Sequence, residues 1–343
     1  MKSIRNLRLG LALAVLFATA FTTNAQENFF EREVKVGKNT TLTIDNKFGD
    51  IQCANWDSDR VHIVVDVTGP GTSEADIRDV VEIDFEASGN EVRVQTEIDG
   101  GLESQSVQID YMIQMPAYLN IDFTNKFGSI YIETITGNTS IDNKFGAVQI
   151  GTLEGERNDI EIKFGGLEID YIKNGHLEVS NGDTEIQKAE NLNLESKFGG
   201  VELGKVKKAV LEVKNGSMRA DKIADLEYEG AFGGVKIKEV NGSVLLENSY
   251  GNSEISRLAE DVKNVTIDNK FGKVKIGIHH NASFALICDV KMGSFYYPEE
   301  MTRFSSVESS MTSKSYTGTI GKGSSGHSME LESKNGDIVI FEY

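Results

Sequence analysis

A short repeat built around glycine dominates this chain. The tripeptide Lys-Phe-Gly recurs six times, and related triplets that end in Gly fill the intervals between its copies. From Gly128 to Gly293 these glycines follow one another at short and nearly constant steps. A regular short period indicates a repeat architecture, in which each unit packs on its neighbours. The six tripeptides begin at Lys47, Lys126, Lys144, Lys163, Lys197 and Lys270.

The residues around each glycine alternate in polarity. An apolar residue such as Ile44 stands five positions before the glycine, and apolar residues such as Ile51 and Cys53 follow it two and four positions later. Alternation on both sides of a glycine predicts strand, tight bend, strand. One unit cannot bury its own apolar face, but stacked units can. We therefore predict an all-β fold, a right-handed parallel β-solenoid (β-helix) with about 17–21 residues per coil, in which the glycines stack.

An aromatic residue stands immediately before the glycine in eight copies. One interpretation is a stacking platform for a ligand; the other is an internal ladder of rings, each packing on the next coil. Parity with Ile44 and Asn46 points Phe48 inward, and asparagines at the same position in other copies place the column at a corner. We therefore expect the internal ladder, in which replacing Phe198 with Ala costs about 3–5 kcal/mol.

An acidic column and a lysine column stand four and two positions before the glycine, as in Asp45 and Lys47. Both should lie on one outward face, because residues two apart on a strand share a face. Stacked carboxylates could bind calcium. The adjoining lysines instead favour a solvated face whose opposite charges balance.

Residues 26–120 depart from the regular period. The first copy, Leu42–Cys53, is separated from the second by a long stretch that contains further alternating segments. A solenoid end exposes apolar strands and unpaired edges, so it needs a cover. We predict an N-terminal β cap with inserted strands over 26–120, a helical patch near Ser73–Val81, and solenoid repeats over 121–343. The segment 298–329, rich in Ser, Thr and Gly, is expected to be a loop or an irregular last coil.

The N-terminus has the pattern of a secretory signal peptide. Three basic residues precede the uncharged apolar run Leu9–Phe21, and Ala25 offers a cleavage point before Gln26. The run is too short to span a membrane, which takes about 20 apolar residues. We therefore expect residues 1–25 to be removed, no transmembrane segment in the mature chain, and a location in the periplasm, at the cell surface or outside the cell.

The net charge and the reactive side chains limit which functions this chain can have. Lys and Arg total 35 against 53 for Asp and Glu, a net charge of −18, which opposes binding to nucleic acid. Cys53 and Cys288 occupy apolar positions of the strand pattern and are expected to be buried free thiols. The histidines His62, His176, His279, His280 and His327 form no metal or catalytic motif; the adjacent pair should point to opposite faces of a strand. We predict no catalytic, metal-ligating or cofactor-binding residue and no cofactor.

The repeat resembles a known bacterial family. The resemblance is carried by the opening Val34-x-Val36-Gly37 and Leu42-x-Ile44-x-Asn46, by Tyr111-Met112-Ile113-x-x-Pro116, and by the serial Asn/Lys-x-Gly turns. Together they are similar to the bacterial "putative adhesin" family of secreted repeat proteins, a domain of unknown function. The resemblance implies a β-solenoid fold and surface adhesion, and it offers no catalytic residues.

Three functional classes follow from the sequence. The preferred one is a secreted or cell-surface protein without enzymatic activity, an adhesin or envelope scaffold whose partner is a protein or a glycan. The second is a β-helix enzyme acting on polysaccharide, a lyase or glycosidase, which needs a cleft and a distinct pair of catalytic groups. The third is a self-assembling structural element, which the negative charge opposes. Repeat stacks offer long flat faces, which favours the first.

Overall fold

The computed structural model describes residues 29–69, 80–98, 107–321 and 326–343. These residues form 27 strands and one short 3-10 helix, Glu299–Met301, which confirms the all-β prediction. The predicted leader 1–25 lies outside the described residues, as does Ser73–Val81 apart from its last two positions. The chain divides into two compact units, Met1–Leu177 and Glu178–Tyr343.

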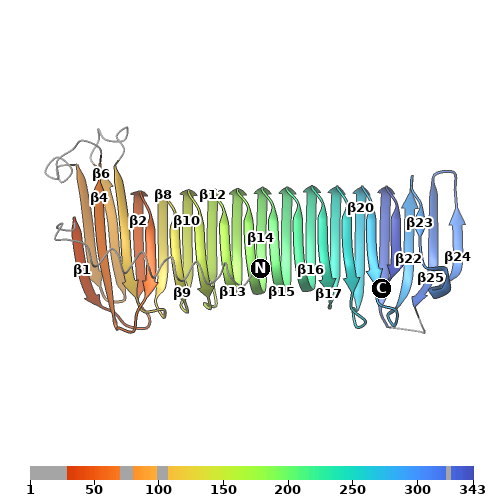
Figure 1. Cartoon of the computed structure of the whole chain (residues 1–343), viewed down its shortest axis with the longest axis horizontal. Helices are drawn as coiled ribbons and strands as arrows, with labels where there is room; N and C mark the ends of the chain where they lie inside the picture. Colours follow the sequence, from red (N-terminus) through yellow and green to blue (C-terminus); the bar gives the residue numbers. More distant parts are fainter. Residues whose placement is uncertain (1–28, 70–79, 99–106, 322–325) are drawn as a thin grey trace. The chain divides into compact units, whose positions relative to one another are not determined.

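The first unit is a stack of parallel strands in register (Figure 1). Each coil has a first strand ending at the aromatic residue before a corner glycine, and a second strand beginning two residues after that glycine. Phe127 pairs with Phe48 on one side and with Phe145 on the other. The first strands are β2 (Thr41–Phe48), β8 (Asn120–Phe127), β10 (Thr139–Phe145) and β12 (Asn158–Phe164). The second strands are β3 (Ile51–Asn55), β9 (Ile130–Ile135), β11 (Val148–Leu153) and β13 (Leu167–Asn181).

Both strands of a coil turn alternate side chains into one interior. Ile141 on β10 and Ile150 on β11 are almost fully buried, as are their equivalents in the neighbouring coils. The described residues contain no α-helix that could cover these faces, so the two strands of each coil cover one another. The stack is therefore solenoid-like, as the period of the repeat predicts.

The N-terminal coil is covered by antiparallel strands. Strand β2 lies between β8 and β6 (Glu91–Ile98), and β6 pairs antiparallel with β5 (Val81–Ser88). On the other side of the coil, β3 pairs with β7 (Gln108–Met115). Beyond β7 the order continues antiparallel through β4 (Arg60–Thr68) to β1 (Phe30–Lys35). The long stretch between the first two copies of the repeat is thus an insertion whose strands close the end of the stack.

A buried polar cluster fixes the cap to the first coil. The hydroxyl of Tyr111 lies 2.7 Å from the hydroxyl of Thr96, which donates to the Asn46 side-chain oxygen at 3.3 Å. All three side chains are almost fully buried. Hydrogen bonds between buried polar groups tie β7, β6 and β2 to one register, since a shifted register would leave these groups unpaired.

The second unit begins with longer strands. Strands β14 (Thr184–Phe198), β15 (Val201–Asn215) and β16 (Met218–Phe232) are each continuous over 15 residues, and they pair in parallel without a change of register. The stack then continues with shorter strands, two of which take the place of one 15-residue strand. The first of them pairs with the beginning of β16 and the second with its end. These are β17 (Val235–Val240), β18 (Val244–Tyr250), β19 (Ser253–Leu258), β20 (Asn264–Phe271) and β21 (Val274–Ile278).

The C-terminal coils are stacked out of chain order. Strand β26 (Ser328–Asn335) pairs with β20 on one side and with β22 (Ser283–Lys291) on the other. Strand β27 (Ile338–Glu342) likewise lies between β21 and β23 (Phe295–Tyr296). The last coil in the sequence, β26 and β27, therefore lies in the stack between the coil of β20 and β21 and the coil of β22 and β23.

The prediction of a loop or irregular coil over 298–329 is wrong for most of that segment. Strands β24 (Thr302–Ser309) and β25 (Ser313–Gly321) form an antiparallel hairpin that continues the sheet from β22. This segment is rich in Ser and Thr and has few apolar residues, so the apolar–polar alternation that indicates a strand is weak. Most of β24 is exposed, so the hairpin buries few side chains of this strand.

Candidate functional site

The candidate site is a row of exposed and half-buried aromatic rings at the glycine corner of each unit, here called the corner ridge. In the first unit its members are Phe48, Phe127, Phe145 and Phe164. Successive ring centroids lie 5.0 to 5.2 Å apart, and the ring planes differ by 6 to 8°. This spacing follows from the distance between hydrogen-bonded strands.

The corner ridge of the second unit is formed by Phe198, Phe232, Tyr250 and Phe271. Tyr250 stacks between Phe232 and Phe271 with centroid distances of 4.9 and 4.8 Å. Asn215 takes the aromatic position between Phe198 and Phe232. The exposed fraction reaches 55% for both Phe198 and Phe232, so much of each ring faces solvent.

The rings stack at the corner as predicted, but the expectation that they point inward is wrong. At most corners the interior is filled by the side chain two positions before the ring. Asn143, for example, is fully buried and donates through its side-chain amide to the Gly146 carbonyl at 2.8 Å. The chain bends between this side chain and the glycine, so strand parity no longer holds and the ring turns outward. The first interpretation of the column, a platform for a ligand, is thereby restored.

Lysines and carboxylates flank the corner ridge as the sequence predicts. Lys163 lies 3.3 Å from Glu161 in its own coil and 3.8 Å from Asp142 in the neighbouring coil. In the second unit Lys214 contacts Glu212 at 3.0 Å and Glu195 at 3.2 Å. The hydrogen bond from Lys214 holds the pKa of the Glu195 carboxyl below its usual range. The two columns thus neutralise each other along the outer face.

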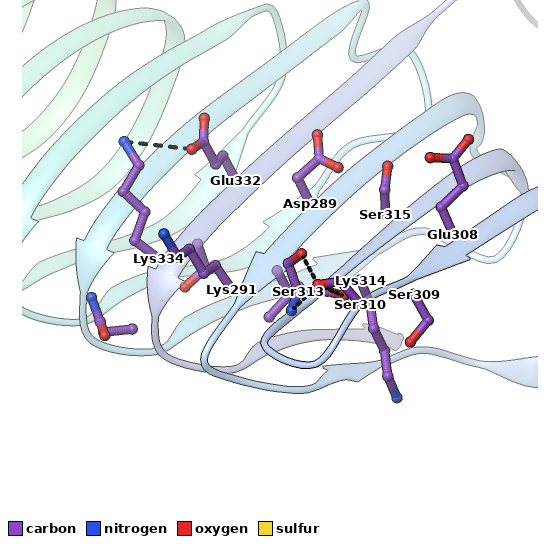
Figure 2. Close-up of a pocket in the computed structure, with 13 residues that line it drawn as sticks. Asp289, Lys291, Glu308, Ser309, Ser310, Ser313, Lys314, Ser315, Glu332 and Lys334 are labelled. Carbon is purple, nitrogen blue, oxygen red and sulfur yellow. Dashed lines mark hydrogen bonds and ion pairs between the residues drawn. The ribbon is translucent and has the colours of Figure 1, made fainter.

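The same columns continue into a hollow at the C-terminal hairpin (Figure 2), whose volume is about 680 Å³. Glu332, Asp289, Ser315 and Glu308 lie side by side on β26, β22, β25 and β24. Lys334 contacts Glu332 at 3.4 Å and Asp268 at 3.8 Å, the same pairing as in other coils. The hollow is therefore lined by the repeat on one side and by the hairpin on the other. Sequence patterning missed that Glu308 adds a carboxylate to this row, with Ser315 between it and Asp289, because the hairpin lacks the corner glycine.

The cysteines and histidines form no second site. Cys53 and Cys288 are buried free thiols, as predicted, and burial raises the pKa of each thiol. The expectation that His279 and His280 point to opposite faces is wrong. They follow the end of β21 in a turn, and their ring centroids lie 4.2 Å apart.

The described part of the chain holds neither a candidate metal site nor a candidate membrane-spanning helix. No group of three or more His, Cys, Asp or Glu side chains lies close enough there to hold a metal ion. None of the helices in that part has the length and apolar character needed to cross a bilayer.

The fold and corner ridges define a solenoid-like repeat protein with an aromatic edge. The Toastrack DUF4097 family profile matches residues 80–340, and the chain belongs to this family. This confirms the resemblance found in the repeat motifs. Among curated proteins there is no match.

Two solved structures are similar to this chain over most of its length. One is described as a "putative cell adhesion protein" from Clostridium sporogenes ATCC 15579. It is 10% identical, covers 92% of this chain and 99% of its own, and has a TM-score of 0.18. The other is a "putative adhesin" from Bacteroides fragilis NCTC 9343. It is 12% identical, covers 92% of this chain and 98% of its own, and has a TM-score of 0.23.

Proposed function

We propose that this is a non-enzymatic binding protein of the cell envelope or cell surface, and that it binds its partner through the corner ridges. The exposure of the ridge rings, 55% for both Phe198 and Phe232, is the observation that carries this proposal. Exposed apolar patches on soluble proteins usually mark interaction sites. Aromatic side chains are also enriched among the residues that dominate binding energy.

Repetition shapes the kind of binding we expect. Most ring-bearing coils present a ring, a lysine and a carboxylate at the same relative positions, as around Phe145 and Phe164. A single contact of this kind is weak, but several on one partner add through their high effective concentration. The proposed partner is therefore extended or repetitive, such as an envelope polymer or a densely covered surface.

The carboxylates support binding over catalysis. A catalytic site needs one pair of groups tuned apart from the rest. In the hollow at the C-terminal hairpin, Asp289 and Glu332 belong to a column whose equivalents recur from coil to coil. The polysaccharide-acting enzyme remains the alternative, and it requires a single position whose loss abolishes activity.

Cosedimentation with intact bacterial cells and with isolated envelope fractions tests the proposal. The ridge variant Phe198→Ser/Phe232→Ser/Tyr250→Ser should lose most of the binding. A matched control is Leu245→Ser/Ile287→Ser/Val307→Ser, which removes three apolar side chains of the same unit that are 40 to 52% exposed. Equal losses in both variants, or full binding by the ridge variant, would contradict the proposal. Turnover of any polysaccharide in the same assays would favour the enzyme.

Export is part of the proposal and rests on the N-terminal pattern of residues 1–25. Cell fractionation combined with protease treatment of intact cells should find the protein in the periplasm, on the surface or in the medium. N-terminal sequencing of the recovered protein should begin at Gln26.

A further inference from the structure

A second hollow, of about 580 Å³, surrounds the only tryptophan of the chain. Three loops of the first unit form it. They follow the carboxyl ends of β3, β7 and β9, which neighbour one another in the sheet. The lining residues are Asn55, Trp56, Asp57, Ser58, Asp59, Pro116, Ala117, Tyr118 and Thr136. The hollow shares no residue with the corner ridges.

The aromatic side chains of this hollow are held in place by their polar atoms. The indole N–H of Trp56 donates to the Arg60 carbonyl at 2.7 Å, and its ring stacks on His62 with centroids 6.2 Å apart. The hydroxyl of Tyr118 donates to the Val36 carbonyl at 3.4 Å. The only polar atom of Trp56 is already bonded, so this side chain offers only its ring to a ligand, whereas the Tyr118 hydroxyl has used its hydrogen and can still accept.

Hydrogen-bond acceptors stand beside these rings. Asp59 is paired with Lys35 at 2.9 Å, and the hydrogen bond from Lys35 lowers the pKa of the Asp59 carboxyl. Asp57 is exposed and has no hydrogen-bond or ion-pair partner among the described residues. The side-chain oxygen of Asn55 is buried and also unpaired there, while its amide donates to the Met115 carbonyl at 3.3 Å. The hollow thus combines fixed apolar rings with acceptors that lack donors.

We propose that this hollow, the Trp56 site, binds an uncharged saccharide. Sugars carry apolar C–H faces that pack on aromatic rings, and hydroxyls that donate to carboxylates and amide oxygens. A carboxylated sugar would be repelled by Asp57 and by the net charge of −18. An organic cation would find only one unpaired carboxylate, because Lys35 neutralises Asp59. Pockets of this type bind by apolar walls with a few placed polar groups.

The lone tryptophan makes the test specific, because all tryptophan emission comes from this hollow. The purified protein is titrated with cello-, chito-, xylo-, malto- and manno-oligosaccharides, with oligogalacturonate, and with tetramethylammonium. We expect saturable changes in emission and matching heats in calorimetry for at least one neutral oligosaccharide. Oligogalacturonate and tetramethylammonium should give neither.

Two variants separate binding from folding. Asp57→Asn changes an exposed side chain without a structural role. It should raise the dissociation constant of the saccharide at least about tenfold, because a charged acceptor is lost. Trp56→Ala should abolish the calorimetric signal, with strand content checked by circular dichroism. Leu245→Ala, an exposed apolar change in the other unit and outside the corner ridge, is the matched control and should bind like the wild type. No signal with any neutral saccharide, binding of tetramethylammonium instead, or undiminished affinity in Asp57→Asn would overturn the proposal.

Discussion

The carbonyl oxygen of Gly182 occupies the space that a Cβ atom on Gly199 would need. The two glycines are equivalents in successive coils, and the N–H of Gly182 donates to the Phe198 carbonyl at 2.9 Å. Gly199 also has a φ of 143°, which residues with a side chain rarely adopt. The same close approach recurs within each unit, so the spacing of the coils at the corner depends on glycine.

Gly199→Ala should destabilise the protein by at least about 2 kcal/mol, because the methyl group meets rigid backbone in a strained conformation. Gly200→Ala is the neighbouring control. The nearest atom to its Cβ would be in the Asp183 side chain, at an ordinary 3.4 Å. The control should change stability by no more than about 0.5 kcal/mol. Urea denaturation of both variants decides this, and equal effects would contradict the account of the corner.

The outward position of the rings makes a second prediction. Phe198 is 55% exposed, whereas Leu194, four residues earlier on the same strand, is 1% exposed. Leu194→Ala should cost about 2–5 kcal/mol, as for other buried leucines. Phe198→Ala should cost less than about 1 kcal/mol. A loss at Phe198 as large as at Leu194 would mean that the ring is buried after all.

The two thiols should be inert in the folded protein. Burial raises the pKa of Cys53 and Cys288, and alkylation requires the thiolate. Iodoacetamide at neutral pH should label neither cysteine until urea unfolds the chain, and both afterwards, as read by mass spectrometry of peptides. Rapid labelling of one cysteine without denaturant would show that its coil opens locally.

A half-buried carboxyl group gives a pH dependence of known sign. Burial raises the pKa of Asp110, outweighing the hydrogen bond that it accepts from the Asp50 N–H at 2.8 Å. The folded state therefore favours the protonated acid, and this contribution to stability is lost as pH rises through the raised pKa. Asp110→Asn should therefore be more stable than the wild type at about pH 7.

That gain should disappear below the ordinary range of carboxyl pKa values, where Asp110 is protonated in both states. Asp84→Asn, an exposed change in the cap hairpin, is the control and should alter stability little at either pH. Urea midpoints measured at both pH values provide the comparison. A loss of stability at neutral pH in Asp110→Asn would mean that the charged acid is preferred.

Local patterns predicted the coils but not their order or their corners. The alternation around Ile141 and Ile150 identified both strands of a coil, because burial imposes a period of two. The same parity failed at Phe48, since a side chain two positions earlier fills the bend. The placement of β26 between β20 and β22 is a long-range pairing, which no local pattern encodes. The right hand of the coil stays a prediction.

The Trp56 site shows a different limit. Its residues come from three loops that lie far apart in the sequence, and they meet only because β3, β7 and β9 are neighbours. Nothing in the loop sequences indicates that Tyr118 and Trp56 share a hollow. A sequence motif could have found the corner ridge, whose members recur at a fixed position, but not this site.

The central claim is that binding is the sum of contacts along the corner ridge, and a graded series of variants measures it most directly. The dissociation constant for intact cells is determined for Phe127→Ser, for Phe127→Ser/Phe145→Ser, and for the triple variant with Phe164→Ser. Each lost ring should weaken binding by a similar factor, about fivefold for about 1 kcal/mol. Unchanged binding across the series, or complete loss at the first substitution, would contradict the account.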